Sequence, residues 1–330
     1  MFSFLKNKYL LMSIFFILGI VLGYFLTNLI RPNLSKPDIS FKQLRLPGYE
    51  LINPLIDCDN FSSINNQELF LFKNDMVKLI DKDKNANLKD VSVYFRDLNN
   101  GAWFGVDENA DFSPASLLKV PVMMAYLKKA DDNEAFLNTK LKYAHTFTEE
   151  LSQNIKPTKS IELGKEYSID ELLKYMIVYS DNNAKNVLLE GIDSLDLNQI
   201  YTDLGVNIPG TTGMEDYMSV KDYAAFFRIL YNASYLDKDM SQKALELLSQ
   251  SDFLQGLTSG IPKDVKIAQK FGERKMDDIT QLHDCGIVYY PKKPYLLCVM
   301  TRGNDFNYQA KVIGQISKTV YDSVDKQINK

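Results

Sequence analysis

The sequence predicts an α+β domain in which an antiparallel sheet is built from both ends of the domain and flanked by helices, with a large all-helical insertion between its strands. Strand-like stretches occur near the start and near the end of the domain, whereas the middle carries apolar residues at helical spacing. A sheet must bury its apolar face against another layer, so the helices are expected to pack on it. The chain has 330 residues and 45% hydrophobic content, which is enough for a substantial core.

The N-terminal segment 9–30 contains no charged residue and is long enough to span a bilayer as a helix. Lys6 and Lys8 precede it, no small-residue cleavage site closes it and no cysteine follows it directly, which favours an uncleaved anchor. We therefore expect a cytoplasmic stub at 1–8, a single-pass transmembrane helix at 9–30 in the cell membrane, and an extracytoplasmic remainder. The alternative is a buried helix of a soluble domain.

Residues 31–66 contain several prolines among polar residues and no sustained periodicity, which is typical of a linker. The domain itself is expected at 67–330. It begins with a helix over 68–80, where apolar residues recur at helical spacing, followed by strands over 91–95 and 102–106. Asn-Gly between these strands is a strong hairpin signal.

The middle of the domain alternates helical runs with polar loops, although residues 128–168 show no clear pattern. Ser168 followed by Glu171 is a capping-box pattern that begins a helix. Further helices are expected over 195–204, 220–230 and 241–248, with a Gly/Pro/Thr-rich loop at 205–219. The last third changes character, with strands expected over 265–271, 281–290 and 295–300 and a closing helix over 308–328.

A Ser-x-x-Lys motif begins the most apolar helix of the domain. Ser113 and Pro114 form an N-cap and first-turn pair, which places Ser116 in the first helical turn. Lys119 lies on the same helix face, within reach of the Ser116 hydroxyl. Burial disfavours the charged form of a lysine, and a lysine that gives up its proton easily can act as the base for a serine nucleophile. So short a motif also occurs by chance, so further motifs along the chain are needed before a catalytic role is predicted.

Two companions follow along the chain. Ser180-Asp181-Asn182 is a polar cluster between two buried helical runs, and Lys270-Phe271-Gly272 lies on a predicted strand. Ser116 to Lys119 with these two clusters has the order and approximate spacing of the three motifs of class A β-lactamases and penicillin-binding proteins, which this chain resembles over residues 67–330. The stretch 283–289 is similar to the strand after the third motif in class A-like hydrolases.

The resemblance implies an acyl-serine mechanism. Ser116 would attack a carbonyl, Lys119 would take its proton, and Ser180 would pass a proton to the leaving nitrogen. Lys270 would place positive charge near a substrate carboxylate and, by like-charge repulsion, help to keep Lys119 neutral. The resemblance implies no cofactor and no metal.

Substrate-binding positions follow from the same resemblance. Asn182 would hold the substrate amide, and Gly272 would let the substrate lie against the strand. Backbone N–H groups of Ser116 and Glu273 would meet the oxyanion. The family places Thr or Ser where this chain has Phe271, so Arg274, or Arg302 on the last strand, is considered for the missing carboxylate contact.

A second departure from the family concerns turnover. Class A β-lactamases deacylate with a loop glutamate in a Glu-x-x-Leu-Asn pattern, and the loop 205–219 lacks that pattern. Glu215 is the candidate deacylation base, the alternative being a solvent-facing acid. Three readings therefore stay open: opening of the β-lactam amide, a penicillin-binding DD-peptidase acting on peptidoglycan stem peptides, and an inactive cell-wall-binding homologue.

Composition limits the partners. A net charge of -4 without a Lys/Arg cluster argues against nucleic acid, and scattered cysteines without a histidine cluster argue against a metal. The expected partners are a small β-lactam or stem peptide and the membrane, with the chain a monomer. His283 is either near the site or a hydrogen-bonded structural histidine. Cys285 and Cys298 are expected on neighbouring strands but diagonal to each other, and so as buried thiols rather than a disulfide.

Overall fold

The computed structural model describes residues 16–19, 43–58, 67–147 and 154–328, and the chain divides into two compact units, 1–42 and 43–330. The first unit is described only as a helical turn at 16–19. Within the described ranges, no helix combines the length and apolar character that a membrane span requires. The expected transmembrane helix at 9–30 lies, apart from this turn, outside the described residues and stays a prediction.

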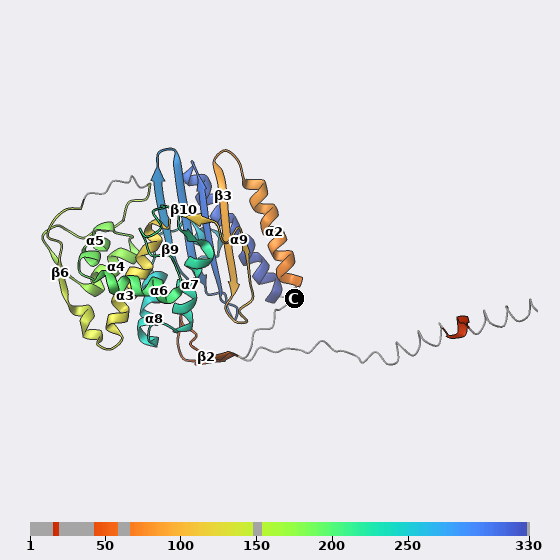
Figure 1. The fold of residues 1–330 in the computed structure, drawn as a ribbon, viewed down its shortest axis with the longest axis horizontal. Coiled ribbons are helices and arrows are strands. Elements are labelled where there is room, and N and C mark those ends of the chain that lie inside the picture. Colours follow the sequence, from red (N-terminus) through yellow and green to blue (C-terminus); the bar gives the residue numbers. More distant parts are fainter. Residues whose placement is uncertain (1–15, 20–42, 59–66, 148–153, 329–330) are drawn as a thin grey trace, which may run out of the picture. The chain divides into compact units, whose positions relative to one another are not determined.

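The second unit is built on a five-stranded antiparallel sheet with the strand order β4-β3-β11-β10-β9 (Figure 1). Its strands are β3 (Leu88–Asp97), β4 (Trp103–Val106), β9 (Ile267–Met276), β10 (Ile279–Val288) and β11 (Tyr295–Gly303). Strands from the start of the domain therefore pair with strands from its end, as predicted. The predicted hairpin is β3–β4, and Gly101 in its turn has a φ of 76°, a conformation that glycine adopts without strain.

Helices cover both faces of the sheet (Figure 1). On one side lie α2 (Gln67–Asp83) and α9 (Phe306–Ile328), one from each end of the domain. On the other side lies the helical insertion, whose members are α3 (Lys119–Ala130), α4 (Ile169–Val178), α5 (Asn182–Glu190), α6 (Ser194–Leu204), α7 (Val220–Asn232) and α8 (Lys238–Ser249). The predicted α+β architecture is confirmed, but the insertion is not all-helical, because it also contains short strands at 140–142, 166–168 and 218–219.

The described residues also form three 3-10 turns and several short strands. The 3-10 turns are η1 (Ala115–Leu118), η2 (Glu134–Asn138) and η3 (Leu257–Gly260), and the small strand pairs are β1 (Gln43–Arg45) with β2 (Leu55–Cys58), β5 (Asp111–Phe112) with β8 (Met218–Ser219), and β6 (Lys140–Lys142) with β7 (Glu166–Ser168).

The capping box that begins α4 is present, since Ser168 Oγ accepts from the Glu171 N–H and the Glu171 side chain accepts from the Ser168 N–H.

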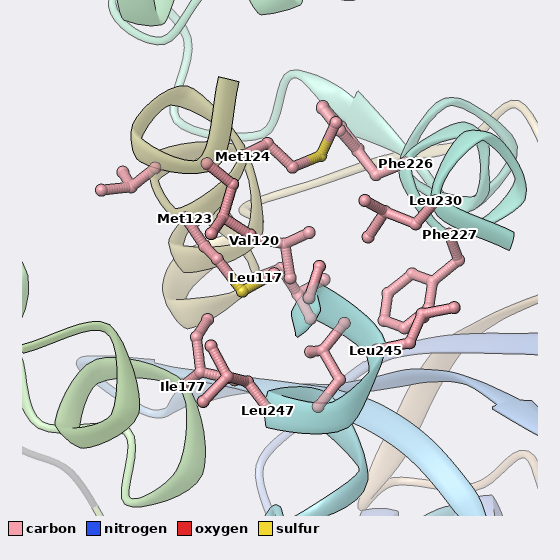
Figure 2. Packing of buried hydrophobic residues seen from close by; sticks show 14 of the residues in the cluster. Leu117, Val120, Met123, Met124, Ile177, Phe226, Phe227, Leu230, Leu245 and Leu247 are labelled. Carbon is pink, nitrogen blue, oxygen red and sulfur yellow. The ribbon is translucent and has the colours of Figure 1, made fainter. Parts of the chain in front are cut away.

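The sheet separates two hydrophobic cores. One lies on the α2 and α9 side. The other is centred on α3, where Val120, Met123 and Met124 pack between Ile177 of α4 and Phe226 of α7 (Figure 2). Because α3 is surrounded in this way, it is apolar on nearly every face, and its first residue, Lys119, is only 1% exposed.

Residues 43–58, expected to be part of a linker, belong to the compact unit. Leu51 and Ile52 are buried in the core around α3, and both of their N–H groups donate to Gln242 Oε1. The guanidinium of Arg45 donates to Leu98 O at 3.2 Å. Prolines and polar residues hide any periodicity here, so the sequence pattern gave no sign that two of these side chains enter the core.

The prediction of free thiols at Cys285 and Cys298 is wrong, because the structure joins these residues in a disulfide. The turn between β10 and β11 runs from Tyr290 to Lys293, whose N–H donates to Tyr290 O at 3.0 Å. The expected diagonal arrangement, with Cys285 opposite Met300, requires a turn centred one residue later, on Lys292 and Lys293. Because the turn is centred one residue earlier, Cys285 lies opposite Cys298. Register in a hairpin follows the turn, so one residue decides which side chains face each other.

The disulfide predicts a specific thiol count. Of the three cysteines in the chain, one should react with a thiol reagent in denaturant without reductant, and all three after reduction. Replacing both Cys285 and Cys298 by Ala should lower the free energy of unfolding by about 3 kcal/mol, because the bond restricts the unfolded chain. Three reactive thiols in unreduced protein would contradict this assignment.

Candidate active site

Ser116 lies in the 3-10 turn η1 and is partly exposed, and the regular α-helix begins only at Lys119. Ala115, just before it, has a φ of 48°, a conformation in which a side chain is strained. The turn is held in place by its neighbours, since Tyr223 of α7, fully buried, donates its hydroxyl to Leu117 O at 3.0 Å. Strain of this kind persists only where the surrounding structure fixes the backbone, and it is common at functional sites.

Ser113 does not cap the helix as predicted, because Pro114 takes the N-cap position without a side-chain hydrogen bond. Ser113 is instead held by the sheet: its N–H donates to Gln281 Oε1 at 3.0 Å, its hydroxyl accepts from Arg274 at 3.0 Å, and its carbonyl accepts from the ring of His283 at 2.9 Å. These tertiary hydrogen bonds replace the local one. They fix the chain just before Ser116.

Gly272 lets β9 approach the Ser116 turn. A Cβ on this glycine would lie 2.7 Å from Pro114 O and 2.9 Å from Leu117 Cγ, so no larger residue fits without moving the turn. The resemblance implied that this glycine makes room for substrate. The space that it leaves is filled instead by the turn that carries Ser116, which places this serine directly beside the strand.

Lys119 and Lys270 converge on one hydroxyl. Lys119 Nζ donates to Ser180 Oγ at 3.0 Å, to Ser180 O at 2.6 Å and to Asn182 Oδ1 at 2.7 Å. Lys270 Nζ, reaching from β9, donates to the same Ser180 Oγ at 3.0 Å. The structure thus brings the second and third motifs together with the lysine of the first. A hydroxyl between two amines is well placed to pass protons from one to the other.

Lys270 is fully buried, and its surroundings shift its titration. Burial lowers the pKa of Lys270 from 10.5 to about 7, an effect that Asp284 and Asp252 partly offset. Its ammonium lies 4.1 Å from the centre of the Phe271 ring and donates to Phe271 O at 3.0 Å. Phe271, which replaces the hydroxyl residue of the family pattern, stacks on Phe253 with 4.3 Å between ring centres. An aromatic face therefore contacts the ammonium at this position.

Asp181 has a structural role that the sequence analysis missed. Its carboxylate caps α5 by accepting from the Asn183 N–H at 3.0 Å, and it also accepts from the Ser160 hydroxyl and the Ile161 N–H. Ser180, just before it, has a φ of 56°. Asp before a helical run is a recognisable N-cap signal, but its further partners are distant in sequence and had no signal.

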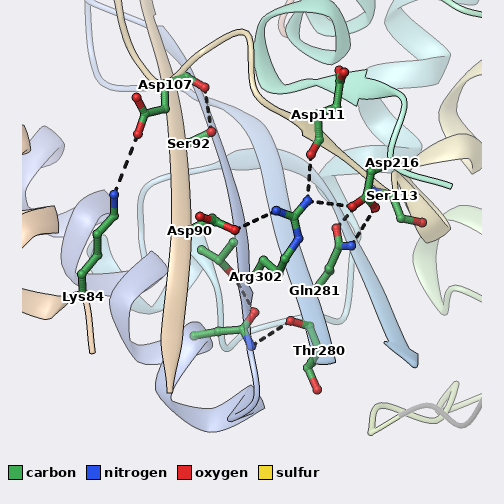
Figure 3. A network of polar contacts seen from close by, with 12 residues as sticks. Lys84, Asp90, Ser92, Asp107, Asp111, Ser113, Asp216, Thr280, Gln281 and Arg302 are labelled. Atoms are coloured by element: carbon green, nitrogen blue, oxygen red, sulfur yellow. Dashed lines mark hydrogen bonds and ion pairs between the residues drawn. The ribbon is translucent and has the colours of Figure 1, made fainter. Parts of the chain in front are cut away.

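Both arginines considered for a substrate carboxylate are paired with acids of the protein. Arg274 contacts Glu215 Oε2 at 2.6 Å, and Arg302 contacts Asp216 at 2.8 Å and Asp90 at 2.7 Å (Figure 3). Gln281 donates to Asp216 and accepts from the Ser113 N–H, so this network joins the loop 205–219 to the Ser116 turn.

His283 is a buried, structural histidine. Burial lowers its pKa to about 4, so the ring is neutral at pH 7. Its Nδ1 accepts from the Thr301 N–H at 3.3 Å, which assigns the ring proton to Nε2 and makes Nε2 the donor to Ser113 O. Of the two alternatives for this residue, the structural one is therefore supported.

The lowered pKa of Lys270 predicts a pH-dependent stability. Between pH 7 and 10.5 the folded chain binds fewer protons than the unfolded chain, so stability rises with pH there. Relative to Lys270→Met, the wild type should gain up to about 1.4 kcal/mol of unfolding free energy per pH unit in this window and nothing below it. Urea unfolding at several pH values measures this, with Lys275→Met, an exposed lysine of the same strand, as control. Parallel curves for wild type and Lys270→Met would contradict the shift.

Comparisons with known proteins identify the family of the chain. The family model described as "Beta-lactamase enzyme family" matches residues 72–324. Among curated proteins, no sequence matches this chain.

Solved structures share the fold. PBP-A is 23% identical with a TM-score of 0.65, covering 78% of this chain and 97% of its own, and a mutant of PBP-A was solved as an acyl-enzyme complex with penicillin G. A β-lactamase from Chitinophaga pinensis is 19% identical (TM-score 0.66; 77% and 99% covered), and the TLA-1 extended-spectrum β-lactamase is 19% identical (TM-score 0.67; 78% and 99% covered). With its motifs converging on one site and the family model matching most of its length, the chain belongs to the beta-lactamase enzyme family.

Proposed function

We propose that this chain is a serine hydrolase that works through an acyl-serine intermediate on Ser116 and opens the amide of a β-lactam ring. The observation that carries the proposal is the pair of buried lysines, Lys119 and Lys270, whose amines both lie 3.0 Å from Ser180 Oγ beside the Ser116 turn. Two amines that share one hydroxyl beside a serine suit the proton transfers of acyl transfer.

The proposed reaction has two stages. Ser116 Oγ attacks the carbonyl carbon while Lys119 takes its proton, and the backbone N–H groups of Ser116 and Glu273 stabilise the oxyanion. Ser180 then gives its proton to the ring nitrogen as the carbon–nitrogen bond breaks, and takes a replacement proton from Lys119, leaving an ester on Ser116. In the second stage, water attacks this ester and regenerates the serine.

Substrate contacts follow from the same groups. Asn182 Oδ1 accepts from Lys119, which leaves its amide nitrogen as a donor for a substrate carbonyl. Lys270 is the proposed cation for a substrate carboxylate, because Arg274 and Arg302 are already paired with acids. Phe271 contributes no hydroxyl to this contact.

A specific observation favours a second candidate, a penicillin-binding DD-peptidase acting on peptidoglycan stem peptides. The proposed deacylation base, Glu215, is held by Arg274 at 2.6 Å. A carboxylate oxygen held by a guanidinium is not available to orient a water against the acyl ester, so hydrolysis of a penicilloyl ester would be slow. Slow deacylation distinguishes a penicillin-binding peptidase from a β-lactamase.

We further propose that residues 9–30 anchor the chain in the cell membrane, with the catalytic domain outside the cytoplasm. The disulfide between Cys285 and Cys298 supports this location, because such bonds persist mainly in oxidising compartments.

Acylation can be tested by intact-mass spectrometry of the full chain mixed with penicillin G. We expect a mass increase of one penicillin on the wild type, located on Ser116 by peptide mapping, and none on Ser116→Ala. An adduct that vanishes as free penicilloate accumulates would identify a β-lactamase, and one that persists would identify the peptidase. No adduct on the wild type would overturn the proposed β-lactam chemistry.

The same assay tests the loop acid. Because Glu215 is held by Arg274, we expect Glu215→Gln to change the adduct lifetime by less than about twofold, whereas loss of a true general base slows a step by about 100-fold or more. Asp216→Asn, in the same loop, is the matched control. A lifetime that lengthens 100-fold only in Glu215→Gln would assign deacylation to Glu215.

A further inference from the structure

The segment 154–161 is tied to β9 by the side chain of Glu273. One carboxylate oxygen of Glu273 accepts from the Asn154 N–H at 2.7 Å and from the Asn154 side-chain amide, and the other accepts from the Ile155 N–H at 3.1 Å. Glu273 is only 6% exposed. A buried carboxylate that accepts several N–H groups is a strong and geometrically specific tie.

The other end of the segment is tied to the second motif. The carboxylate of Asp181, 1% exposed, accepts from the Ser160 hydroxyl at 2.7 Å and from the Ile161 N–H at 2.9 Å. Between the two ends, the hydroxyl of Thr158 donates to Asp252, and Pro157 restricts the backbone. The segment 154–161 is therefore held at each end by hydrogen bonds to a buried carboxylate.

The two ties lie beside the groups that would flank a substrate. Glu273 follows Gly272, which packs on the Ser116 turn, and Asp181 follows Ser180, which accepts from both lysines. In the proposed reaction the acyl donor lies between β9 and the loop that carries Ser180 and Asn182. The segment 154–161 connects β9 to that loop, and so limits how far the two can separate.

We propose that Glu273 is a specificity-determining residue: by fixing residues 154 and 155 against β9, its side chain restricts the site to acyl donors with slender side chains. This inference rests on the proposed acylation of Ser116. A bulky donor must break the hydrogen bonds of a buried carboxylate, which leaves that group unsatisfied, whereas a slender donor leaves them intact.

The test compares two penicillins with the same ring and carboxylate. One is penicillin G, and the other carries a fluorophore on its side-chain amide. Acylation of the full chain by each is followed by intact mass in the wild type and in Glu273→Ala, which leaves the backbone N–H in place. We expect the rate constant for the tagged penicillin, divided by that for penicillin G, to rise about tenfold or more in Glu273→Ala, because pocket sterics discriminate by that order.

Two further variants keep the test decisive. Ser160→Ala removes the hydrogen bond to Asp181 at the other end of the segment 154–161, and should raise the same ratio by a smaller factor. Glu162→Ala removes an exposed carboxylate that pairs with Lys165, three residues away, and should leave the ratio unchanged. Hydrogen exchange should show faster exchange of the Asn154 and Ile155 amides in Glu273→Ala alone.

The outcomes separate this inference from the proposed function. If the wild type is acylated but Glu273→Ala slows or speeds both penicillins equally, Glu273 is a structural residue and the inference is wrong. If neither penicillin acylates the wild type, the proposed β-lactam chemistry fails, and the specificity role fails with it.

Discussion

The structure depends on two lysine amines that are removed from water and share one serine hydroxyl. Lys119 comes from the helical insertion and Lys270 from the edge strand of the sheet, and both donate to Ser180 Oγ. Buried amines are costly unless they are hydrogen-bonded or lose their charge, and the lowered pKa of Lys270 reflects that cost. The helical insertion and the sheet must therefore meet with little freedom at this point, which is also where the proposed chemistry takes place.

The turn that carries Ser116 is also fixed by contacts between the helical insertion and the sheet. Ser113, Pro114 and Leu117 are each contacted by the sheet or by α7, and a neutral His283 donates to the Ser113 carbonyl from the neighbouring strand. A charged histidine could not be buried here without a partner. These contacts hold Ala115 in an unfavourable conformation just before Ser116, so the rigidity of the sheet reaches the reactive group directly.

Much of this arrangement was predictable from local pattern. The β3–β4 hairpin, the buried α3 and the capping box of α4 each have a short-range physical cause, and each is present in the structure. The three motifs also predicted that the side chains of Lys119, Ser180 and Lys270 would lie together. Errors occurred where a long-range contact decided the outcome: Ser113 as a cap, residues 43–58 as linker, and the register of Cys285 against Cys298.

The sequence by itself determined the types of the reactive groups, their order along the chain, and the periodicity that forms each helix and strand, because these depend on neighbours within a few residues. Only the tertiary structure decided how the charged groups pair. Arg274 and Arg302 bind acids of the loop 205–219, and Glu273 and Asp181 hold the segment 154–161. The physical reason is that a buried or half-buried charge takes whichever partner the folded backbone brings within reach, and that partner is set by packing and register across the whole domain.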